Sequence, residues 1–187
     1  SDFLAPSENE FIMPSTGVDM IVRYNLLTER ATTWIMNTVN SWAFAASNDN
    51  AVFLATPGIP EQKAHIIKVN ADDSKQDLAN LTFLNISAAD VDPANRLCIA
   101  TDEGFFRLEI DGTLTKILPS TVLGDVFPNR AGNFAVGPDG KWYCISTDYN
   151  DTIKVYFFDE QGNISFLPIA FNRASFGNAF QVTDARI

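Results

Sequence analysis

The chain has 187 residues, of which 46% are hydrophobic and 12% aromatic, and its formal net charge is −10 at pH 7. A length of about 100–200 residues suits one domain with a sizeable core, which argues against disorder for most of the chain. The acidity argues against nucleic acid and anionic membranes as partners, because both repel a surface that lacks clustered lysine and arginine.

Short segments rich in β-branched and aromatic residues recur along the chain and predict strands. In chain order, the first unit has predicted strands at 10–16, 21–24 and 32–36, and the second at 44–46, 51–56, 66–69 and 81–84. The third has them around Val91 and at 98–101, 105–108 and 114–118, and the fourth around Val136 and at 142–147, 153–158 and 164–168. Turn residues separate them at 48–50, 92–95, 111–112, 138–140 and 161–163. Residues 72–80 are the one segment with the composition of a short helix.

Three columns of similar residues share a period of about 45 residues, which indicates four copies of one structural unit. A small residue followed by threonine recurs at Thr16, Thr56, Thr101 and Thr147. Downstream of each, an apolar run is interrupted by one cation, at Arg23, Lys68, Arg107 and Lys154. Upstream lies a third column, spaced by 45, 45 and 46 positions, at Ala46, Val91, Val136 and Val182.

Several of these strands are apolar on both faces, such as the segment from Trp142 to Ile145. A strand of this kind is buried on both sides, as in a propeller, where each blade packs between two neighbours. The sequence therefore predicts an all-β fold, a β-propeller of four four-stranded blades, in one domain over residues 1–187. The predicted blades are residues 9–38 together with 174–187, then 40–85, 86–129 and 130–172.

The two ends of the sequence are complementary. The first unit starts near Glu10 at a second strand, and residues 177–182 match a first strand with no unit after it. We expect the C-terminal strand to complete the first blade, which would remove an exposed sheet edge. Two alternatives stay open: the chain is a piece of a longer propeller, or two chains pair into a larger ring.

Residues 90–108 and 134–147 resemble the repeats of the NHL, SMP-30/gluconolactonase and sensor-kinase periplasmic propellers. In those families, a first strand ends in an Asp-Pro type of turn, and the next strand ends in small residues and threonine. The resemblance covers the two later units well and the first two loosely. It implies a propeller architecture and leaves the activity open, because these repeats occur in enzymes, sensors and scaffolds alike.

A lactonase similar to the SMP-30 group would need a divalent metal held by carboxylates and an asparagine. Oxygen ligands of this kind suit Ca²⁺, so calcium is the cofactor that this alternative implies. The metal candidates are Asp90, Asp92, Asn133 and Asp139. Asn95, Asn178 and Asp184 are further candidates of the same residue types. Tight turns also require aspartate and asparagine, so a structural role explains the same residues.

The remaining polar and aromatic candidates have structural interpretations. His65, the only histidine, starts a strand and would have to carry any histidine-based chemistry alone. The cation column is interpreted as long stems that cover apolar blade edges while their charges reach solvent. Trp34 and Trp142 fall inside strands and are expected in the core, whereas Trp42 precedes a strand and is the candidate for binding a sugar.

Targeting features leave the compartment open. The sequence contains no run of about 20 apolar residues, and residues 1–6 lack the character of a secretory signal, although a signal removed earlier would leave no trace. Cys98 and Cys144 are too few for a disulfide framework and are interpreted as buried thiols. Free thiols favour the cytoplasm or a virion over an oxidising compartment.

The sequence has a well-defined repeat but no set of catalytic residues expected to meet at one site. This combination favours a non-enzymatic structural or protein-interaction module in a larger assembly. Its partners would be other proteins or further copies of the chain. The alternatives are a metal-dependent lactonase of the SMP-30 kind and a carbohydrate-binding propeller.

Overall fold

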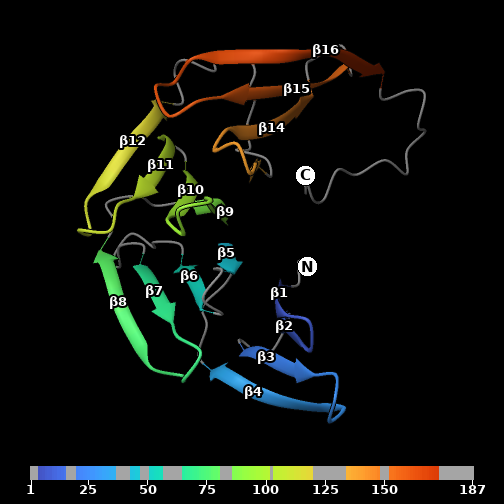
Figure 1. Cartoon of the computed structure of the whole chain (residues 1–187), viewed down its shortest axis with the longest axis vertical. Helices are drawn as coiled ribbons and strands as arrows, with labels where there is room; N and C mark the ends of the chain where they lie inside the picture. The colour runs from blue at the N-terminus through green and yellow to red at the C-terminus, as the bar shows by residue number, and fades with distance from the viewer. Residues whose placement is uncertain are drawn as a thin grey trace. The chain divides into compact units, whose positions relative to one another are not determined.

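The computed structural model describes residues 4–15, 20–36, 43–46, 51–56, 65–80, 86–101, 103–119, 134–147 and 152–172. These residues form four antiparallel sheets of four strands each, and no helix occurs among them (Figure 1). The prediction of an all-β fold is therefore confirmed. Among the described residues, no helix has the length and apolar character needed to span a bilayer. The chain divides into two compact units, Ser1–Ile86 and Ser87–Ile187.

The first unit contains two sheets, each built as a meander in which consecutive strands pair. Sheet 1 consists of β1 (Leu4–Ser7), β2 (Glu10–Ser15), β3 (Met20–Asn25) and β4 (Arg30–Met36). Sheet 2 consists of β5 (Ala43–Ala46), β6 (Val52–Thr56), β7 (His65–Val69) and β8 (Lys75–Asn80).

The second unit repeats this arrangement in two further sheets (Figure 1). Sheet 3 consists of β9 (Ile86–Val91), β10 (Leu97–Thr101), β11 (Gly104–Leu108) and β12 (Leu114–Pro119). Sheet 4 consists of β13 (Phe134–Val136), β14 (Trp142–Thr147), β15 (Thr152–Phe158) and β16 (Ile164–Asn172).

The start of the first sheet differs from the prediction. We expected this unit to lack its first strand, but β1 pairs with β2, with Leu4 opposite Ile12 and Ser7 opposite Glu10. A two-residue turn at positions 8–9 lets the chain fold back at once, and the prediction overlooked this short hairpin. The C-terminal segment 177–182 lies outside the described residues, so its pairing stays a prediction.

The expectation of a helix at residues 72–80 is wrong, because β8 occupies Lys75–Asn80. A tight turn precedes this strand: Asn70 N donates to Ser74 O at 2.9 Å. Asp72 Oδ1 accepts hydrogen bonds from Ser74 N at 3.0 Å and from its hydroxyl at 2.6 Å. These bonds end β7 and start the next strand directly, as side chain–backbone bonds commonly do in turns. The fourth strand predicted at 81–84 lies outside the described residues.

The threonine column has a local physical cause in sheet 3. Thr101 ends β10, and its hydroxyl donates to Gly104 O at 3.1 Å and accepts from Glu103 N at 3.1 Å. One side chain thus satisfies two backbone groups of the tight β10–β11 connection, as threonine does in short turns. β6 and β14 also end at a threonine of this column.

The fourth strand of each sheet bulges away from regular pairing. Between β11 and β12, Phe105 lies opposite Leu118 but Phe106 lies opposite Lys116, so one residue of β12 is extra. β4, β8 and β16 show the same kind of shift against their neighbours. Bulges twist a sheet edge and make it a poor template for further pairing, so these edges are protected against aggregation.

The core of the second unit lies between sheets 3 and 4. Its buried residues are Cys98, Ala100, Phe105, Ile117, Leu118, Phe134, Trp142, Cys144 and Phe158. Phe105 is central, since its ring lies edge-on to Phe134 at 5.6 Å and to Trp142 at 5.7 Å. Aromatic pairs in this geometry contribute about 0.5–1.5 kcal/mol each beyond their area burial. Trp142 is thus a core residue, as the sequence predicted.

Candidate functional site

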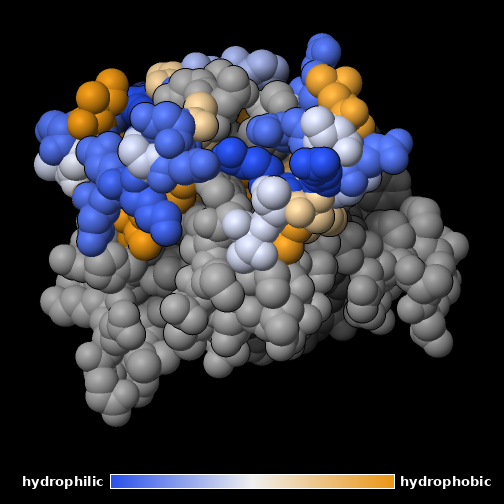
Figure 2. Space-filling model, turned by 90° about the horizontal axis from the view of Figure 1, so that it is seen from below, coloured by the Kyte–Doolittle hydropathy of each residue, from blue (hydrophilic) through white to orange (hydrophobic). Residues whose placement is uncertain are grey.

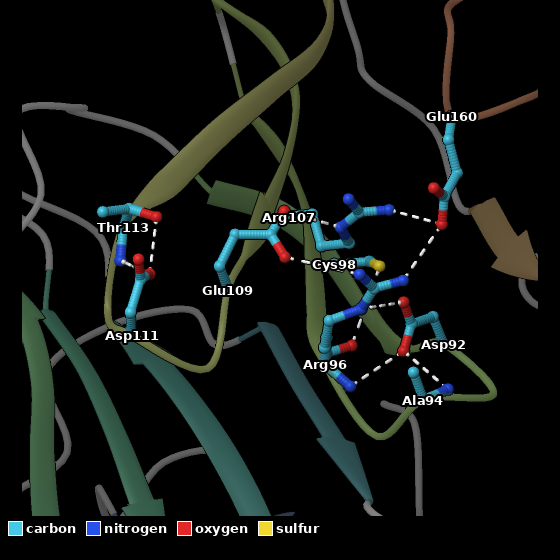
Figure 3. A network of polar contacts seen from close by, with 9 residues as sticks. All are labelled: Asp92, Ala94, Arg96, Cys98, Arg107, Glu109, Asp111, Thr113 and Glu160. Carbon is cyan, nitrogen blue, oxygen red and sulfur yellow. Dashed lines mark hydrogen bonds and ion pairs between the residues drawn. The ribbon is translucent and has the colours of Figure 1, made fainter.

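Among the described residues of the second unit, two arginines and three carboxylates form an extensive polar site. We call it the arginine cluster: Asp92, Arg96, Arg107, Glu109 and Glu160 (Figure 3). The turn between β9 and β10 supplies the first two residues, β11 supplies Arg107, and Glu109 directly follows β11. Glu160 comes from the turn between β15 and β16, so the cluster links sheet 3 to sheet 4.

Glu160 lies between the two arginines (Figure 3). Its Oε1 atom is 3.0 Å from Arg96 Nη2 and 2.6 Å from Arg107 Nη1. Both arginine side chains are largely buried, whereas Glu160 keeps 44% of its side chain exposed. Since Glu160 is partly exposed, water screens its charge, and each pair contributes little to stability by itself.

The other two carboxylates orient the arginines from within sheet 3. Asp92 Oδ2 accepts a hydrogen bond from Arg96 Nε at 2.7 Å. Glu109 accepts one from Arg107 Nε at 2.9 Å and lies 3.3 Å from Arg96 Nη1. Each guanidinium group is therefore held by more than one carboxylate, which fixes its position as forked pairing does.

The cluster shifts the pKa values of Arg96 and Glu109 toward their charged forms. Partial burial acts to lower the pKa of Arg96, but hydrogen bonds to Asp92 and Glu160 and the nearby acidic charges raise it overall. Partial burial likewise acts to raise the pKa of Glu109, but hydrogen bonds from Arg107 and Thr115 and the two arginine charges lower it. Ion pairing thus outweighs desolvation in both cases.

The burial of Arg107 corrects the interpretation of the cation column. We expected its charge to reach solvent, but the residue is only 8% exposed and its guanidinium group is paired inside the cluster. Arg23 similarly pairs with Asp73 at 3.2 Å, from sheet 1 to the β7–β8 turn of sheet 2. Lys68 instead covers an apolar ring as predicted, with its ammonium 5.6 Å from the centre of Phe53.

The structure also removes Lys154 from that column. Arg23, Lys68 and Arg107 each stand two residues before the residue that opens the third-to-fourth-strand turn. In sheet 4 that turn opens at Asp159, so the equivalent residue is Phe157. The sequence alignment was wrong here because β14 and β15 are longer than their counterparts β10 and β11.

Three of the four metal candidates form hydrogen bonds within the chain. Asp92 Oδ1 accepts from Ala94 N at 3.0 Å and from Arg96 N at 2.8 Å. Asp139 accepts from Lys141 N and from the Tyr143 hydroxyl, both at 3.1 Å. Within the described ranges, no three His, Cys, Asp or Glu side chains gather so that they could hold a metal ion.

Asp90 has a different position from the other candidates, because it joins the first strands of two sheets. Its Oδ1 atom accepts from Val91 N at 2.8 Å, and its Oδ2 atom accepts from Val136 N at 2.7 Å. β9 of sheet 3 is thereby bonded to β13 of sheet 4. Asp90 and Glu160 are thus two polar links between these sheets, in addition to the aromatic core.

Both thiols are free and buried within that core. Burial raises the pKa of Cys98 well above its ordinary value, where the charges of Asp92 and Asp90 act in the same direction. Burial also raises the pKa of Cys144. A buried thiol of this kind is unreactive, since the thiolate is the nucleophile.

Several sequence candidates lie outside the described residues: Trp42, Asn133, Asn178 and Asp184, together with the side chains of Trp34, His65 and Lys154. Sequence reasoning missed Glu109 and Glu160. A signal for Glu109 was present, because an acid two residues after Arg107 is close to it on the same sheet face. Glu160 gave no such signal, because it lies 53 positions after Arg107 in the sequence.

The charges of the arginine cluster are already paired with one another, which limits what the cluster could bind. Its two cations face three carboxylates, so an anionic ligand would have to displace Glu109 or Glu160 to reach them. The arrangement holds neighbouring sheets together and fixes the turns on which it is built.

No family model matches the sequence, and no curated protein matches it. Solved structures do match. TolB from Acinetobacter baumannii is 14% identical with a TM-score of 0.64, and the match covers 89% of this chain and 43% of that one. A candidate gluconolactonase is 13% identical with a TM-score of 0.62, covering 85% of this chain and 60% of the other.

A chain of the nidogen–laminin complex is also similar, at 14% identity and a TM-score of 0.62, covering 84% of this chain and 60% of the other. These matches confirm the resemblance to propeller families at the level of the fold. The chain spans less than two thirds of the length of these three solved structures. Identities this low carry the fold and not the activity.

Proposed function

We propose that this chain is a non-enzymatic protein-binding module that presents apolar side chains on ordered hairpin turns. The observation that carries the proposal is Ile110, which is 93% exposed at the β11–β12 turn. A single exposed apolar residue is ordinary on a protein surface. Ile110 differs because hydrogen bonds fix the turn that carries it.

The β11–β12 turn is ordered by four hydrogen bonds. Glu109 N donates to Thr113 O at 2.8 Å, and Gly112 N donates to Glu109 O at 3.0 Å. Asp111 Oδ1 accepts from Thr113 N at 2.9 Å and from the Thr113 hydroxyl at 2.6 Å. Binding through such a turn loses little conformational entropy, because the backbone is already fixed before the partner arrives.

Sheet 1 repeats this design at its own third-to-fourth-strand turn. Leu27 is 75% exposed, and Asn25 Oδ1 accepts hydrogen bonds from Leu27 N and Thr28 N, both at 3.0 Å. The coloured surface in Figure 2 is mostly hydrophilic, with hydrophobic residues at separate places. Isolated apolar side chains among charges suit a selective protein interface, where a few anchors carry most of the affinity.

A photo-crosslinking experiment tests this proposal. A benzophenone amino acid at position 110 or 27, exposed to an extract of the source organism, is expected to label the same protein. Lys116 is the control position, because it is exposed but lies on β12 and outside the turn. The proposal fails if positions 110 and 116 give the same labelling pattern, or if calcium-dependent lactone hydrolysis is found in the purified chain.

A further inference from the structure

Two arginine side chains of sheet 3 converge on a single oxygen atom of sheet 4 (Figure 3). Arg107 Nη1 lies 2.6 Å and Arg96 Nη2 lies 3.0 Å from Glu160 Oε1. N–H donors on guanidinium groups match the geometry of a carboxylate. Since both arginines are largely buried, removing this carboxylate leaves N–H donors without a partner where water replaces it poorly. The two guanidinium groups thus have the geometry of a binding site for one carboxylate.

Bonds within sheet 3 and its turns hold both guanidinium groups in place without help from Glu160. Arg96 Nε donates to Asp92 Oδ2 at 2.7 Å, and Arg107 Nε donates to Glu109 Oε1 at 2.9 Å. Asp92 is itself fixed, because its Oδ1 atom accepts hydrogen bonds from two backbone N–H groups of its own turn. We therefore expect the two Nη atoms to stay directed at the same point when the Glu160 carboxylate is removed.

The turn of sheet 4 that carries Glu160 is ordered by its own bonds as well. Asp159 Oδ1 accepts from Gln161 N at 3.0 Å and from Asn163 N at 2.9 Å. Its Oδ2 atom accepts from the Asn163 amide group at 2.8 Å, and Gly162 N donates to Asp159 O at 3.0 Å. These bonds do not involve the Glu160 side chain. Shortening that side chain to alanine should therefore vacate the carboxylate position and leave both walls of the site standing.

The charges of the cluster set how strongly such a site binds. Asp92 and Glu109 already match the two arginine charges on sheet 3, so a third carboxylate is held mainly by directed hydrogen bonds. A free carboxylate is thus a weak ligand. In the intact chain it also competes with Glu160, which the turn holds beside the arginines at a high effective concentration. The intact chain therefore fills the site with its own side chain.

We propose that Arg96 and Arg107 form a binding site for one small carboxylate anion, which the intact chain fills with Glu160. The turn between β15 and β16 is held to sheet 3 by this internal ligand, and a free carboxylate replaces it when Glu160 is shortened. The site is separate from the exposed turns of Leu27 and Ile110, so the inference does not rest on the protein-binding function.

Chemical rescue of Glu160→Ala tests this assignment. Urea titrations of the full 187-residue chain are followed by circular dichroism in sodium acetate, with sodium chloride added to keep the ionic strength constant. Acetate is expected to raise the folded-to-unfolded equilibrium constant of the variant saturably, by about tenfold at about ten times the dissociation constant. The wild type should show only the non-saturating effect that a salt excluded from protein surfaces has on any protein.

Two control variants separate the site from other effects of acetate. Glu160→Gln removes the charge but keeps a side chain of the same size in place, so acetate finds no room and gives no rescue beyond the wild type. Glu103→Ala removes an exposed carboxylate that lies 3.5 Å from Lys116, and it should respond to acetate as the wild type does.

The assignment is wrong if acetate stabilises Glu160→Ala no more than the wild type. It is also wrong if Glu160→Gln or Glu103→Ala gains as much as Glu160→Ala, because the gain then does not come from the vacated position. If Glu160→Ala is unfolded in chloride, saturating acetate is expected to restore the circular dichroism spectrum of the wild type, and a variant that stays unfolded in acetate equally overturns the assignment.

Discussion

At the scale of single residues, this chain uses its polar side chains mainly to fix turns. Asp72, Asp111 and Asp159 each accept hydrogen bonds from the backbone of the following residues. The pKa values of the three carboxyl groups are lowered most by hydrogen bonds from the side chains of Ser74, Thr113 and Asn163, and further by these backbone bonds, because both favour the charged form. Asp92 and Asp139, which the sequence suggested as metal ligands, likewise accept hydrogen bonds from the backbone of their own turns.

Two turn glycines allow a test of backbone strain against packing. Gly112 and Gly162 have φ values of 84° and 76°, a region that costs other residues about 1–2 kcal/mol. At Gly112 an added Cβ meets nothing within 4 Å, but at Gly162 it lies 3.0 Å from Ile117 O of sheet 3. We expect Gly112→Ala to lower the free energy of unfolding by about 1 kcal/mol and Gly162→Ala by about 2 kcal/mol or more.

Urea titrations of the two alanine variants provide the measurement. Equal losses would mean that the backbone moves to accommodate the methyl group at position 162. In that case, the close approach of this turn to β12 is not a constraint on the fold.

At the scale of elements, sheets 3 and 4 are held together by one aromatic core with polar links on either side. Asp90 joins the first strands, and Glu160, in the turn between β15 and β16, pairs with the arginines of sheet 3. Between them, Phe105 contacts three aromatic rings of sheet 4. The apolar contact dominates in energy, because partly exposed ion pairs contribute little.

A pair of phenylalanine substitutions separates the core from the surface. Phe105→Ala removes a ring that is 1% exposed, and we expect it to lower the free energy of unfolding by about 3–5 kcal/mol. Phe166→Ala removes a ring that is 67% exposed and should change stability by less than about 0.5 kcal/mol. Thermal melts followed by circular dichroism measure both. Similar effects of the two variants would show that sheets 3 and 4 do not share this core.

At the scale of the whole molecule, the chain is acidic, and many of its carboxyl groups are stabilised in the charged form. The pKa values of Glu109, Asp72, Asp111, Asp139 and Asp159 all lie below their ordinary values. A carboxyl group whose folded-state pKa is depressed contributes stability above its unfolded pKa, and this stability is lost as the pH falls through the folded pKa.

We therefore expect stability to hold above pH 4.5, the ordinary value for glutamate, and to fall as the solution is acidified below it. Glu109→Gln should lower the melting temperature at neutral pH and make its decline in acid less steep. Glu103→Gln is the control, because that exposed carboxylate lies 3.5 Å from one exposed lysine, Lys116. A melting temperature independent of pH from neutral down to below 4.5 would contradict this account.

The sequence by itself determined the strands, most of the turns and the repeat, because these depend on local chemistry. Thr101 shows why, since its hydroxyl bonds to residues two and three positions away. Residue periodicity also placed Trp142 in the core correctly. The short hairpin of β1 and β2 and the strand β8 are also local, but the pattern of apolar residues there is too weak to reveal them.

Only the tertiary structure decided which charges meet. Arg107 and Glu160 are 53 positions apart, and their pairing depends on how sheet 4 packs on sheet 3. The structure also decides that Phe157, and not Lys154, is the counterpart of Arg107, because the longer strands β14 and β15 shift the register relative to the sequence repeat. Contacts between sheets are set by packing geometry, and a one-dimensional period does not contain that geometry.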